Sequence, residues 1–236
     1  MMRSQSIYGF LLMSALGFTF IACGDDQKFL DAPTTLSVTP DNTTMSVGQE
    51  KQLSASGATK WTSENEYVAK VDARGVVFAN HIGTANIYAS DDNAMGKCTI
   101  TVDPHYLCYD TPLLNFGASM KSIIDAETHQ KNRSDSKYLY YNYTNGTIQT
   151  LVQYVFDDND ALEGINVIAT YSDYTKIAFY LLERYEYAAQ ADNSSLFINA
   201  LTEEATTLLV LLSKYTNGNN NYTVVTYMPY TLKIEH

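Results

Sequence analysis

The chain has 236 residues, of which 45% are hydrophobic and 17% are charged, and this balance is typical of a globular protein. Its formal net charge is −11 at pH 7, from 15 basic and 26 acidic residues. Binding to nucleic acid or to anionic lipid requires basic patches, so the charge argues against both kinds of partner.

The N-terminus has the layout of a secretion signal peptide. Arg3 precedes an apolar stretch, Ile7–Ala22, that is too short for a comfortable transmembrane helix. The end of this stretch, Phe20–Gly24 (FIACG), resembles the lipobox of bacterial lipoproteins. In that family a diacylglycerol is attached to the cysteine and the chain is cut before it. The resemblance implies that residues 1–22 are a signal peptide and that Cys23 is the lipid-anchored first residue of the mature protein.

The residues that follow the cysteine predict the membrane in which the anchor lies. Residues 23–33 are polar and are expected to form a tether. Gly24 directly after the cysteine, in place of Asp, resembles the pattern of outer-membrane lipoproteins. The acidic pair Asp25-Asp26 resembles an export tag of some surface lipoproteins. We therefore expect a lipid-anchored outer-membrane protein, with either a periplasmic or a surface-exposed position.

Residues 34–103 predict a domain made of β-strands. Short runs alternate apolar and polar side chains, as in Ala85–Ala89 and Cys98–Val102, and turns such as Asp72–Gly75 separate them. Short strands at this spacing favour a β-sandwich. Trp61, the single tryptophan of the chain, is expected to anchor the core between the two sheets.

Five motifs in this segment carry a resemblance to a known family. They are Val47–Leu53, Trp61–Asn65, Val68–Asp72, Gly75–Val77 and Gly83–Ile87. In this order they resemble the bacterial Ig-like domain of group 2. The resemblance implies an Ig-like sandwich with adhesive, spacer or carbohydrate-proximal roles at bacterial surfaces, and it transfers no catalytic residue. Three glycines are expected at turns that need unusual φ angles: Gly48, Gly75 and Gly83.

Residues 104–236 predict a second domain of the α+β class. Helices are expected at about 115–124 and 173–184, and strands at about 137–143, 148–156, 161–171, 185–191, 196–201, 205–215 and 222–230, with a polar loop at 128–136. The order of helix, strands, helix and strands suggests a duplicated unit with helices packed on antiparallel sheets. By element order alone it resembles the doubled helix-plus-sheet units of periplasmic binding and inhibitor modules. The whole chain is therefore predicted to be mainly β, with two domains.

One segment of this domain allows two interpretations. Thr202–Glu204 precedes a run of leucines and could begin a helix. Thr206 and Thr207 favour β structure, and the Asn-rich loop after residue 216 suits a hairpin. We therefore predict a strand at 205–215.

The two cysteines beyond Cys23 are Cys98 and Cys108. An exported chain can form a disulfide, and the Asp103-Pro104 pair between the two could reverse the chain direction. Cys98 also lies on a predicted strand, where a buried free thiol is an equal alternative. The sequence leaves both interpretations open, because it does not give the Cα separation that a disulfide requires.

The sequence predicts neither a cofactor nor a metal site. None of the four histidines has partners that complete a metal site: His105 and Cys108 are three residues apart, but no second pair lies near them. No G-x-S-x-G or H-E-x-x-H motif is present. Asp157–Asp160 could give three or four oxygen ligands to calcium but is better explained as a hairpin turn. Glu163, Glu183 and Glu186 could supply the two carboxylates of a glycosidase, but nothing in the sequence brings two of them together. We therefore expect a protein that is not an enzyme.

The second domain holds 16 of the 19 tyrosines, and these are the candidate binding residues. Exposed tyrosine rings can stack on sugars or on protein partners. The residues proposed for a glycan or protein ligand are Tyr138, Tyr140, Tyr141, Tyr222 and Tyr227. The alternative is that one strand face is core and the other carries scattered rings. The working hypothesis is a surface adhesion or ligand-binding lipoprotein; the alternatives are a structural component of an envelope assembly and a hydrolase of surface polymers.

Overall fold

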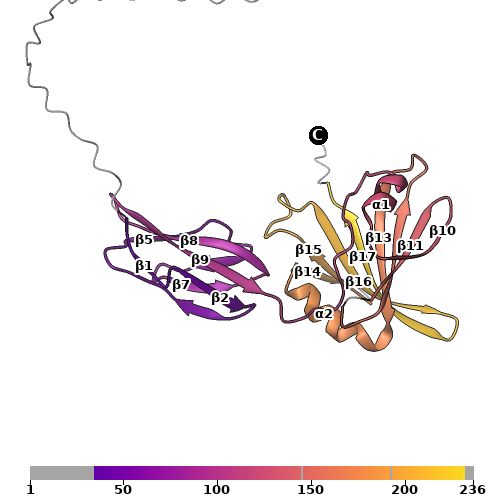
Figure 1. Cartoon of the computed structure of the whole chain (residues 1–236). Coiled ribbons are helices and arrows are strands. Elements are labelled where there is room, and N and C mark those ends of the chain that lie inside the picture. Colours follow the sequence, from indigo (N-terminus) through magenta and orange to yellow (C-terminus); the bar gives the residue numbers. More distant parts are fainter. Residues whose placement is uncertain (1–34, 145, 192, 232–236) are drawn as a thin grey trace, which may run out of the picture. The chain divides into compact units, whose positions relative to one another are not determined.

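The computed structural model describes residues 35–144, 146–191 and 193–231 (Figure 1). The predicted signal peptide, Cys23 and the tether to residue 33 lie outside the described residues. Among the described residues no helix combines the length and apolarity that crossing a membrane requires. This part of the chain holds 17 strands and two α-helices, so the predicted mainly β class is confirmed.

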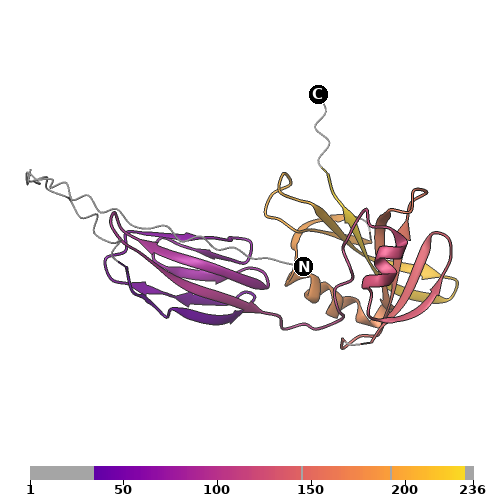
Figure 2. The same ribbon diagram turned by 45° about the horizontal axis from the view of Figure 1, so that its top comes forward.

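The first domain is a β-sandwich of short strands. Its strands are β1 (Val38–Thr39), β2 (Asn42–Ser46), β3 (Glu50–Gln52), β4 (Ser54–Ala55), β5 (Lys60–Ser63), β6 (Ala69–Val71), β7 (Val76–Ala79), β8 (Gly83–Ser90) and β9 (Met95–Asp103). One sheet has the order β2-β9-β8-β5 and another the order β3-β7-β6, while β1 pairs with β4. Figure 2 shows the strands in two layers. β2 runs parallel to β9, and the other pairs are antiparallel.

The sandwich core follows from the alternation in the sequence. Val77, Ile87 and Ile100 are fully buried, because every second residue of their strands faces inward. Trp61 on β5 is partly buried and packs against this core. Its ring lies over Gly75, at the turn before β7 of the other sheet, so the predicted anchor connects the two sheets.

The second domain contains two helices and one large sheet. Its elements are α1 (Met120–Ala126), β10 (Gln130–Ser134), β11 (Tyr138–Tyr143), β12 (Thr150–Phe156), β13 (Leu162–Thr170), α2 (Tyr174–Leu182), β14 (Glu186–Ala191), β15 (Ser194–Ile198), β16 (Leu208–Asn217) and β17 (Asn220–Pro229). A 3-10 turn, Tyr171–Asp173, leads into α2. The sheet is antiparallel, with the order β10-β11-β12-β13-β17-β16-β15-β14.

The predicted duplication is visible in this order. Each helix is followed by a four-stranded meander, β10–β13 after α1 and β14–β17 after α2. The two meanders join through their last strands, β13 and β17, so they form one continuous sheet and not one sheet per helix. The strand predicted for 205–215 is confirmed as β16. The polar loop expected at 128–136 is wrong in part, because β10 pairs there with β11 through exposed, hydrophilic residues that carry no apolar alternation.

The two faces of this sheet differ in what covers them. Ile123 of α1 and Ile177 of α2 lie in one hydrophobic cluster with Tyr154, Val167 and other alternate strand residues, so both helices pack on the same face (Figure 1). We call this the core face. The opposite face, whose side chains alternate with those of the cluster, keeps most of them partly exposed, and we call it the open face.

The two cysteines are free and buried, so the disulfide that the sequence left open is absent from the structure. Cys98 belongs to the core of the first domain and Cys108 to that of the second. Each thiol therefore fills space in a separate hydrophobic core. Burial raises the pKa of both thiols to about 11.

We predict that both thiols are inert in the folded protein. Buried thiols with a raised pKa present little thiolate to a reagent at neutral pH. In a chain that begins at Gly24, a thiol-reactive dye should label neither cysteine before unfolding and both after unfolding without reductant. Failure to label both after unfolding would indicate a disulfide.

Candidate functional site

The candidate site lies on the open face, along one row of side chains that crosses all eight strands. Each member is the register partner of the next: Arg133, Tyr140, Gln153, Asn166, Thr226, Leu211, Leu196 and Ala189. The row changes character along its length. Its members on β10, β11, β12, β13 and β17 are polar, and we call this part the polar half. Its members on β16, β15 and β14 are apolar and form the apolar half.

The polar half contains a hydrogen-bonded ladder of four residues. Nε2 of Gln153 donates to the Tyr140 hydroxyl at 2.8 Å, and Nδ2 of Asn166 donates to Oε1 of Gln153 at 2.9 Å. The Thr226 hydroxyl donates to Oδ1 of Asn166 at 2.8 Å. We call Tyr140, Gln153, Asn166 and Thr226 the polar ladder. Neighbouring strands place these groups about 4.8 Å apart, which lets each side chain reach the next.

Two depressions flank the polar ladder and share Asn166 and Thr226. The first, of about 370 Å³, is lined by Gln153, Asn166, Ile168, Ser213, Lys214, Tyr215, Val224 and Thr226. The second, of about 350 Å³, is lined by Val155, Glu163, Gly164, Ile165, Asn166, Thr226 and Met228. Each depression therefore combines amide and hydroxyl groups with aliphatic side chains. Glu163 lines the second depression, whereas Lys214, the register partner of the buried Thr223, borders the first from the core-face side of β16.

The apolar half of the row has a pocket of its own. This pocket, of about 270 Å³, is lined by Ala188, Leu196, Ile198, Glu203, Thr206, Leu209 and Tyr230. The Tyr230 hydroxyl donates to Oε1 of Glu203 at 2.6 Å. β14, the strand beside this pocket, is the last of the sheet, and Tyr187 on it is 47% exposed.

The structure divides the five predicted tyrosines between the two faces. Tyr138, Tyr140 and Tyr222 alternate with core residues and lie on the open face. Tyr141 and Tyr227 lie in the core, so their prediction as ligand contacts is wrong. Tyr140 also differs from the expected exposed ring, because it is only 8% exposed and the Arg133 guanidinium lies 4.2 Å from its ring centre.

Tyr227 has a structural role that can be tested. Its hydroxyl and that of Tyr109 are hydrogen-bonded at 2.8 Å inside the core, and burial raises the pKa of both. Tyr227→Phe leaves the Tyr109 hydroxyl without this partner, so we expect a loss of roughly 1–3 kcal/mol in the free energy of unfolding. Urea denaturation, followed by the near-UV circular dichroism of tyrosine, measures this loss. Tyr222→Phe on the open face is the control, and an equal effect of the two changes would contradict the assignment.

The sequence analysis missed three of the four ladder residues. Gln153 and Asn166 are 13 residues apart, and Asn166 and Thr226 are 60 apart, so no local pattern connects them. The signal that the sequence did carry was a polar residue in the middle of each strand, where alternation places it on the face opposite the core.

The candidate ion loop is a hairpin turn in the structure. Oδ1 of Asp157 accepts backbone hydrogen bonds from Asn159 and Ala161, both at 2.8 Å. The Lys137 ammonium pairs with Asp158 at 2.5 Å. The oxygens of this loop therefore bind the chain itself, as the turn interpretation expected, and no group of three ligating side chains that could hold a metal occurs among the described residues.

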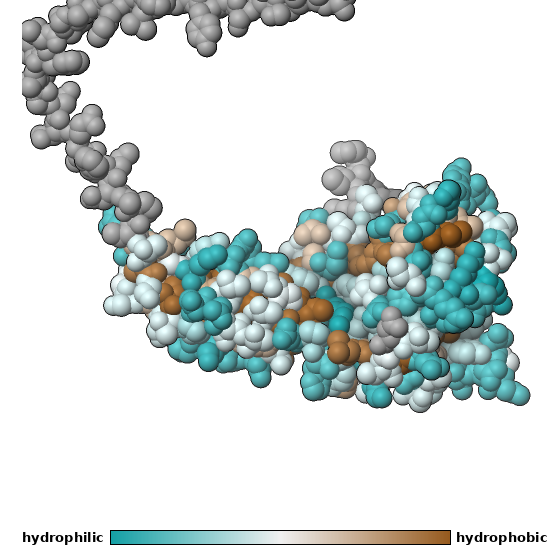
Figure 3. All heavy atoms as spheres, in the orientation of Figure 1, coloured by the Kyte–Doolittle hydropathy of each residue, from teal (hydrophilic) through white to brown (hydrophobic). Residues whose placement is uncertain are grey.

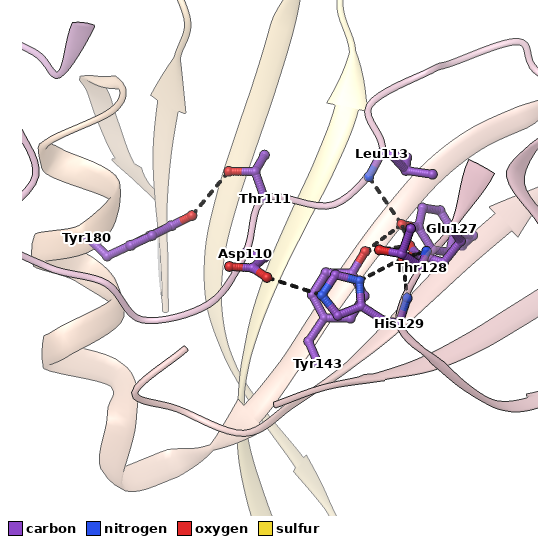
Figure 4. Close-up of polar contacts among 9 residues, drawn as sticks. Asp110, Thr111, Leu113, Glu127, Thr128, His129, Tyr143 and Tyr180 are labelled. Atoms are coloured by element: carbon purple, nitrogen blue, oxygen red, sulfur yellow. Dashed lines mark hydrogen bonds and ion pairs between the residues drawn. The ribbon is translucent and has the colours of Figure 1, made fainter. Parts of the chain in front are cut away.

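A second polar cluster lies on the core face, at the C-terminal end of α1, where Glu127 is the C-cap residue (Figure 4). Oε2 of Glu127 accepts from the hydroxyls of Tyr143 at 2.6 Å and Tyr154 at 2.5 Å. Oε1 accepts from Nδ1 of His129 at 2.7 Å and from the backbone N–H groups of Thr128 and His129. Burial raises the pKa of Glu127, but the hydrogen bonds from Tyr143, Tyr154 and His129 outweigh it and lower the pKa to about 2.

The geometry of this cluster favours a structural role. The five hydrogen bonds use the roughly four lone-pair directions of the Glu127 carboxylate, which leaves none for a substrate. The His129 ring stacks on Tyr143, with ring centres 3.5 Å apart, and its Nε2 contacts Asp110 at 3.2 Å. The Tyr154 hydroxyl accepts from the backbone N–H of Leu113 at 3.1 Å. The cluster thus fixes the chain around residues 110–113 to the sheet.

Figure 3 shows how hydropathy is distributed over one side of the molecule. In the orientation of Figure 1, hydrophilic residues cover most of the surface, and hydrophobic residues show in separate patches (Figure 3). Two of the three glutamates considered for glycoside hydrolysis, Glu163 and Glu183, contact different groups. Glu163 lines the second depression. The buried Glu183 carboxylate accepts hydrogen bonds from the backbone N–H groups of His105 and Tyr106, at 2.9–3.2 Å.

Comparison with known proteins identifies the first domain. Residues 32–102 match the family of bacterial Ig-like domains (group 2), which confirms the resemblance drawn from the sequence motifs. A search of the curated proteins found no match. A solved structure titled "Structure of the S-layer protein SbsC, domains 5-6" is similar at 16% identity, covering 82% of this chain and 83% of that chain, with a TM-score of 0.26. A TM-score this low supports no inference about a shared function.

Proposed function

We propose that the protein is a non-enzymatic cell-envelope lipoprotein that binds a ligand on the open face of its second domain. The group 2 Ig-like domain fits a surface or adhesion-type role and would act as the spacer or adhesive module. The signal-peptide and lipobox pattern supports attachment to the outer membrane through Cys23, with either a periplasmic or a surface position. One stable anchor of this kind would keep the second domain near the membrane.

The observation that carries the binding role is the contrast between the two faces of the sheet. Both helices of the described chain pack on the core face. The open face presents the polar ladder between two depressions, with side chains that are mostly partly exposed. The hydrogen bonds of the ladder hold its two amides in fixed positions on a face that solvent reaches, and placed polar groups beside apolar ones are what a ligand site requires.

A second candidate function is a structural part of an envelope assembly. The observation that favours it is the apolar half of the open face, with Leu196, Ile198 and Leu209 around a pocket and β14 as the edge strand of the sheet in the described part of the chain. An apolar surface beside a free strand edge is suited to protein–protein contact. A hydrolase is less well supported, because Glu163 is the single carboxylate among the described residues of its depression and glycoside hydrolysis uses two.

The test places one bulky charge in each half of the same row. A chain that begins at Gly24 is immobilised and exposed to a glycan array and to an envelope extract. Thr226→Lys disrupts the polar ladder, and Leu211→Lys, at the neighbouring position of the row, disrupts the apolar half. Loss of binding in Thr226→Lys alone supports ligand recognition at the ladder, and loss in Leu211→Lys alone favours assembly. Absence of any partner for the unmodified chain contradicts the proposal.

A further inference from the structure

The hydrogen-bonding capacity of the polar ladder indicates what it binds. Each of its two amides, Gln153 and Asn166, uses one N–H and one carbonyl lone pair within the ladder. A side-chain amide has two N–H donors and two lone pairs, so each keeps one donor and one acceptor for a ligand. The count does not depend on how the amide nitrogen and oxygen atoms are assigned, because exchanging them in both residues only reverses donor and acceptor along the ladder. The ladder therefore offers paired donors and acceptors at a repeat of about 4.8 Å, the spacing of neighbouring strands.

The charges around the ladder favour an uncharged ligand. Its four members are neutral, and the charged side chain in the depressions beside it is that of Glu163, an anion that repels anionic ligands. Lys214, which borders the first depression, lies on the core-face side of β16: its register partner is the buried Thr223, and its ammonium lies 4.6 Å from the ring centre of Tyr174 in α2. The chain as a whole carries a net charge of −11, which repels polyanions.

The side chains beside the amides are suited to sugar rings. A pyranose presents hydroxyl groups at its rim and C–H groups on its faces. Ile168 and Val224 line the first depression, and Val155 and Met228 line the second, so aliphatic groups flank the amides on both sides. The strand repeat is on the order of the length of one sugar unit, which would place successive units over successive strands.

We propose that the polar ladder binds an uncharged polysaccharide whose chain runs across the strands, from Thr226 towards Tyr140. The hydroxyl groups of the sugar units exchange hydrogen bonds with the free donors and acceptors of Gln153 and Asn166, and their C–H faces lie on the flanking aliphatic side chains. This inference rests on the proposed binding function and adds the chemical class of the ligand and its direction on the sheet.

The test uses the full chain, purified in a nonionic detergent that has no sugar headgroup. Isothermal titration calorimetry measures binding of neutral gluco-, manno- and galacto-oligosaccharides and, for comparison, of sulfated and sialylated ones. Asn166→Leu has a similar volume but no amide, so we expect it to weaken binding of a neutral oligosaccharide roughly tenfold or more. The near-UV circular dichroism of tyrosine verifies that the second domain remains folded.

The first domain supplies a matched control. Oδ1 of Asn86 accepts from the Thr99 hydroxyl at 2.9 Å, as Asn166 does from Thr226, so Asn86→Leu removes the same chemistry elsewhere. Binding that Asn166→Leu loses and Asn86→Leu keeps supports the inference. Binding of the acidic sugars alone, or equal loss in both variants, overturns it. A protein captured through the ladder, with no glycan bound, overturns this inference and leaves the proposed binding function standing, whereas no binding at all contradicts both.

Discussion

Glu127→Gln is expected to lower the free energy of unfolding of the second domain by about 3 kcal/mol at neutral pH. The carboxylate has a pKa of about 2 in place of its ordinary 4.5, because Tyr143, Tyr154 and His129 donate hydrogen bonds to its charged form. At roughly 1.4 kcal/mol for each pH unit, this difference corresponds to about 3 kcal/mol of stabilisation. The side chain is 2% exposed, so solvent screens these bonds little. Urea denaturation at pH 7 measures the loss.

The same carboxylate predicts how this effect depends on pH. The pKa of Glu127 is lower in the folded than in the unfolded chain, so its contribution is complete above about pH 4.5 and declines as the pH falls towards 2. The stability difference between the unmodified chain and Glu127→Gln should therefore shrink in acid. The exposed Glu204 provides the control, since Glu204→Gln should change stability little at any of these pH values. A difference that stays constant from pH 7 to pH 2 would show that the charge is not the cause.

Gly75→Ala is the second change with a large expected effect, and it acts on the first domain. Gly75 has φ +80°, and a Cβ atom there would lie 2.8 Å from Cε2 and Cζ2 of Trp61 and 3.1 Å from the Leu53 carbonyl oxygen. The left-handed backbone costs an L-residue about 1–2 kcal/mol, and displacing a packed ring costs about 1–3 kcal/mol more. We expect a total loss of about 2–5 kcal/mol, measured by urea denaturation with Trp61 fluorescence as the probe.

Gly48→Ala separates the two parts of that loss. Gly48 has φ +83°, close to that of Gly75, but a Cβ atom there meets nothing within 4 Å. Its replacement should therefore show the backbone cost alone, and the fluorescence of native Trp61 should not change. If the two variants lost equal stability, the clash between the added Cβ atom at position 75 and the Trp61 ring would contribute nothing to the loss. Trp61 is the single tryptophan, so its signal reports on the first domain alone.

Local patterns determined the first domain almost completely. The motif glycines predicted at turns do have positive φ angles, as Gly75 and Gly83 show. In the strands around Ile87 and Ile100, buried and more exposed side chains alternate as predicted, because a strand with one buried face places every second side chain in the core. The match of residues 32–102 to the group 2 family agrees with these motifs. In this sandwich the strands are short and the turn residues lie next to them in the sequence, so local patterns were sufficient to predict most of its elements.

The sequence determined the element order of the second domain but not which tyrosines face solvent. Tyr140 and Tyr141 are neighbours in one strand and point to opposite faces, and the sequence of this strand has rings at both positions. The deciding fact was that α1 and α2 pack on the same face, which makes that face the core. Both helices reach the same face because the two meanders form one sheet through the pairing of β13 with β17. This pairing connects residues that are about 60 positions apart in the sequence.

By itself the sequence determined the class of the chain, the boundaries of most strands and the Ig-like domain, while the lipid attachment at Cys23 stays a prediction. These features depend on composition and on neighbours a few residues apart, where period-two alternation and turn residues act directly. The tertiary structure alone decided that Cys98 and Cys108 lie in separate cores and that Glu127 gathers five hydrogen bonds. It also decided that Gln153, Asn166 and Thr226 form one ladder. Each of these depends on contacts between strands that are adjacent in space and distant along the chain, and such pairing is fixed only when the whole sheet closes on its core.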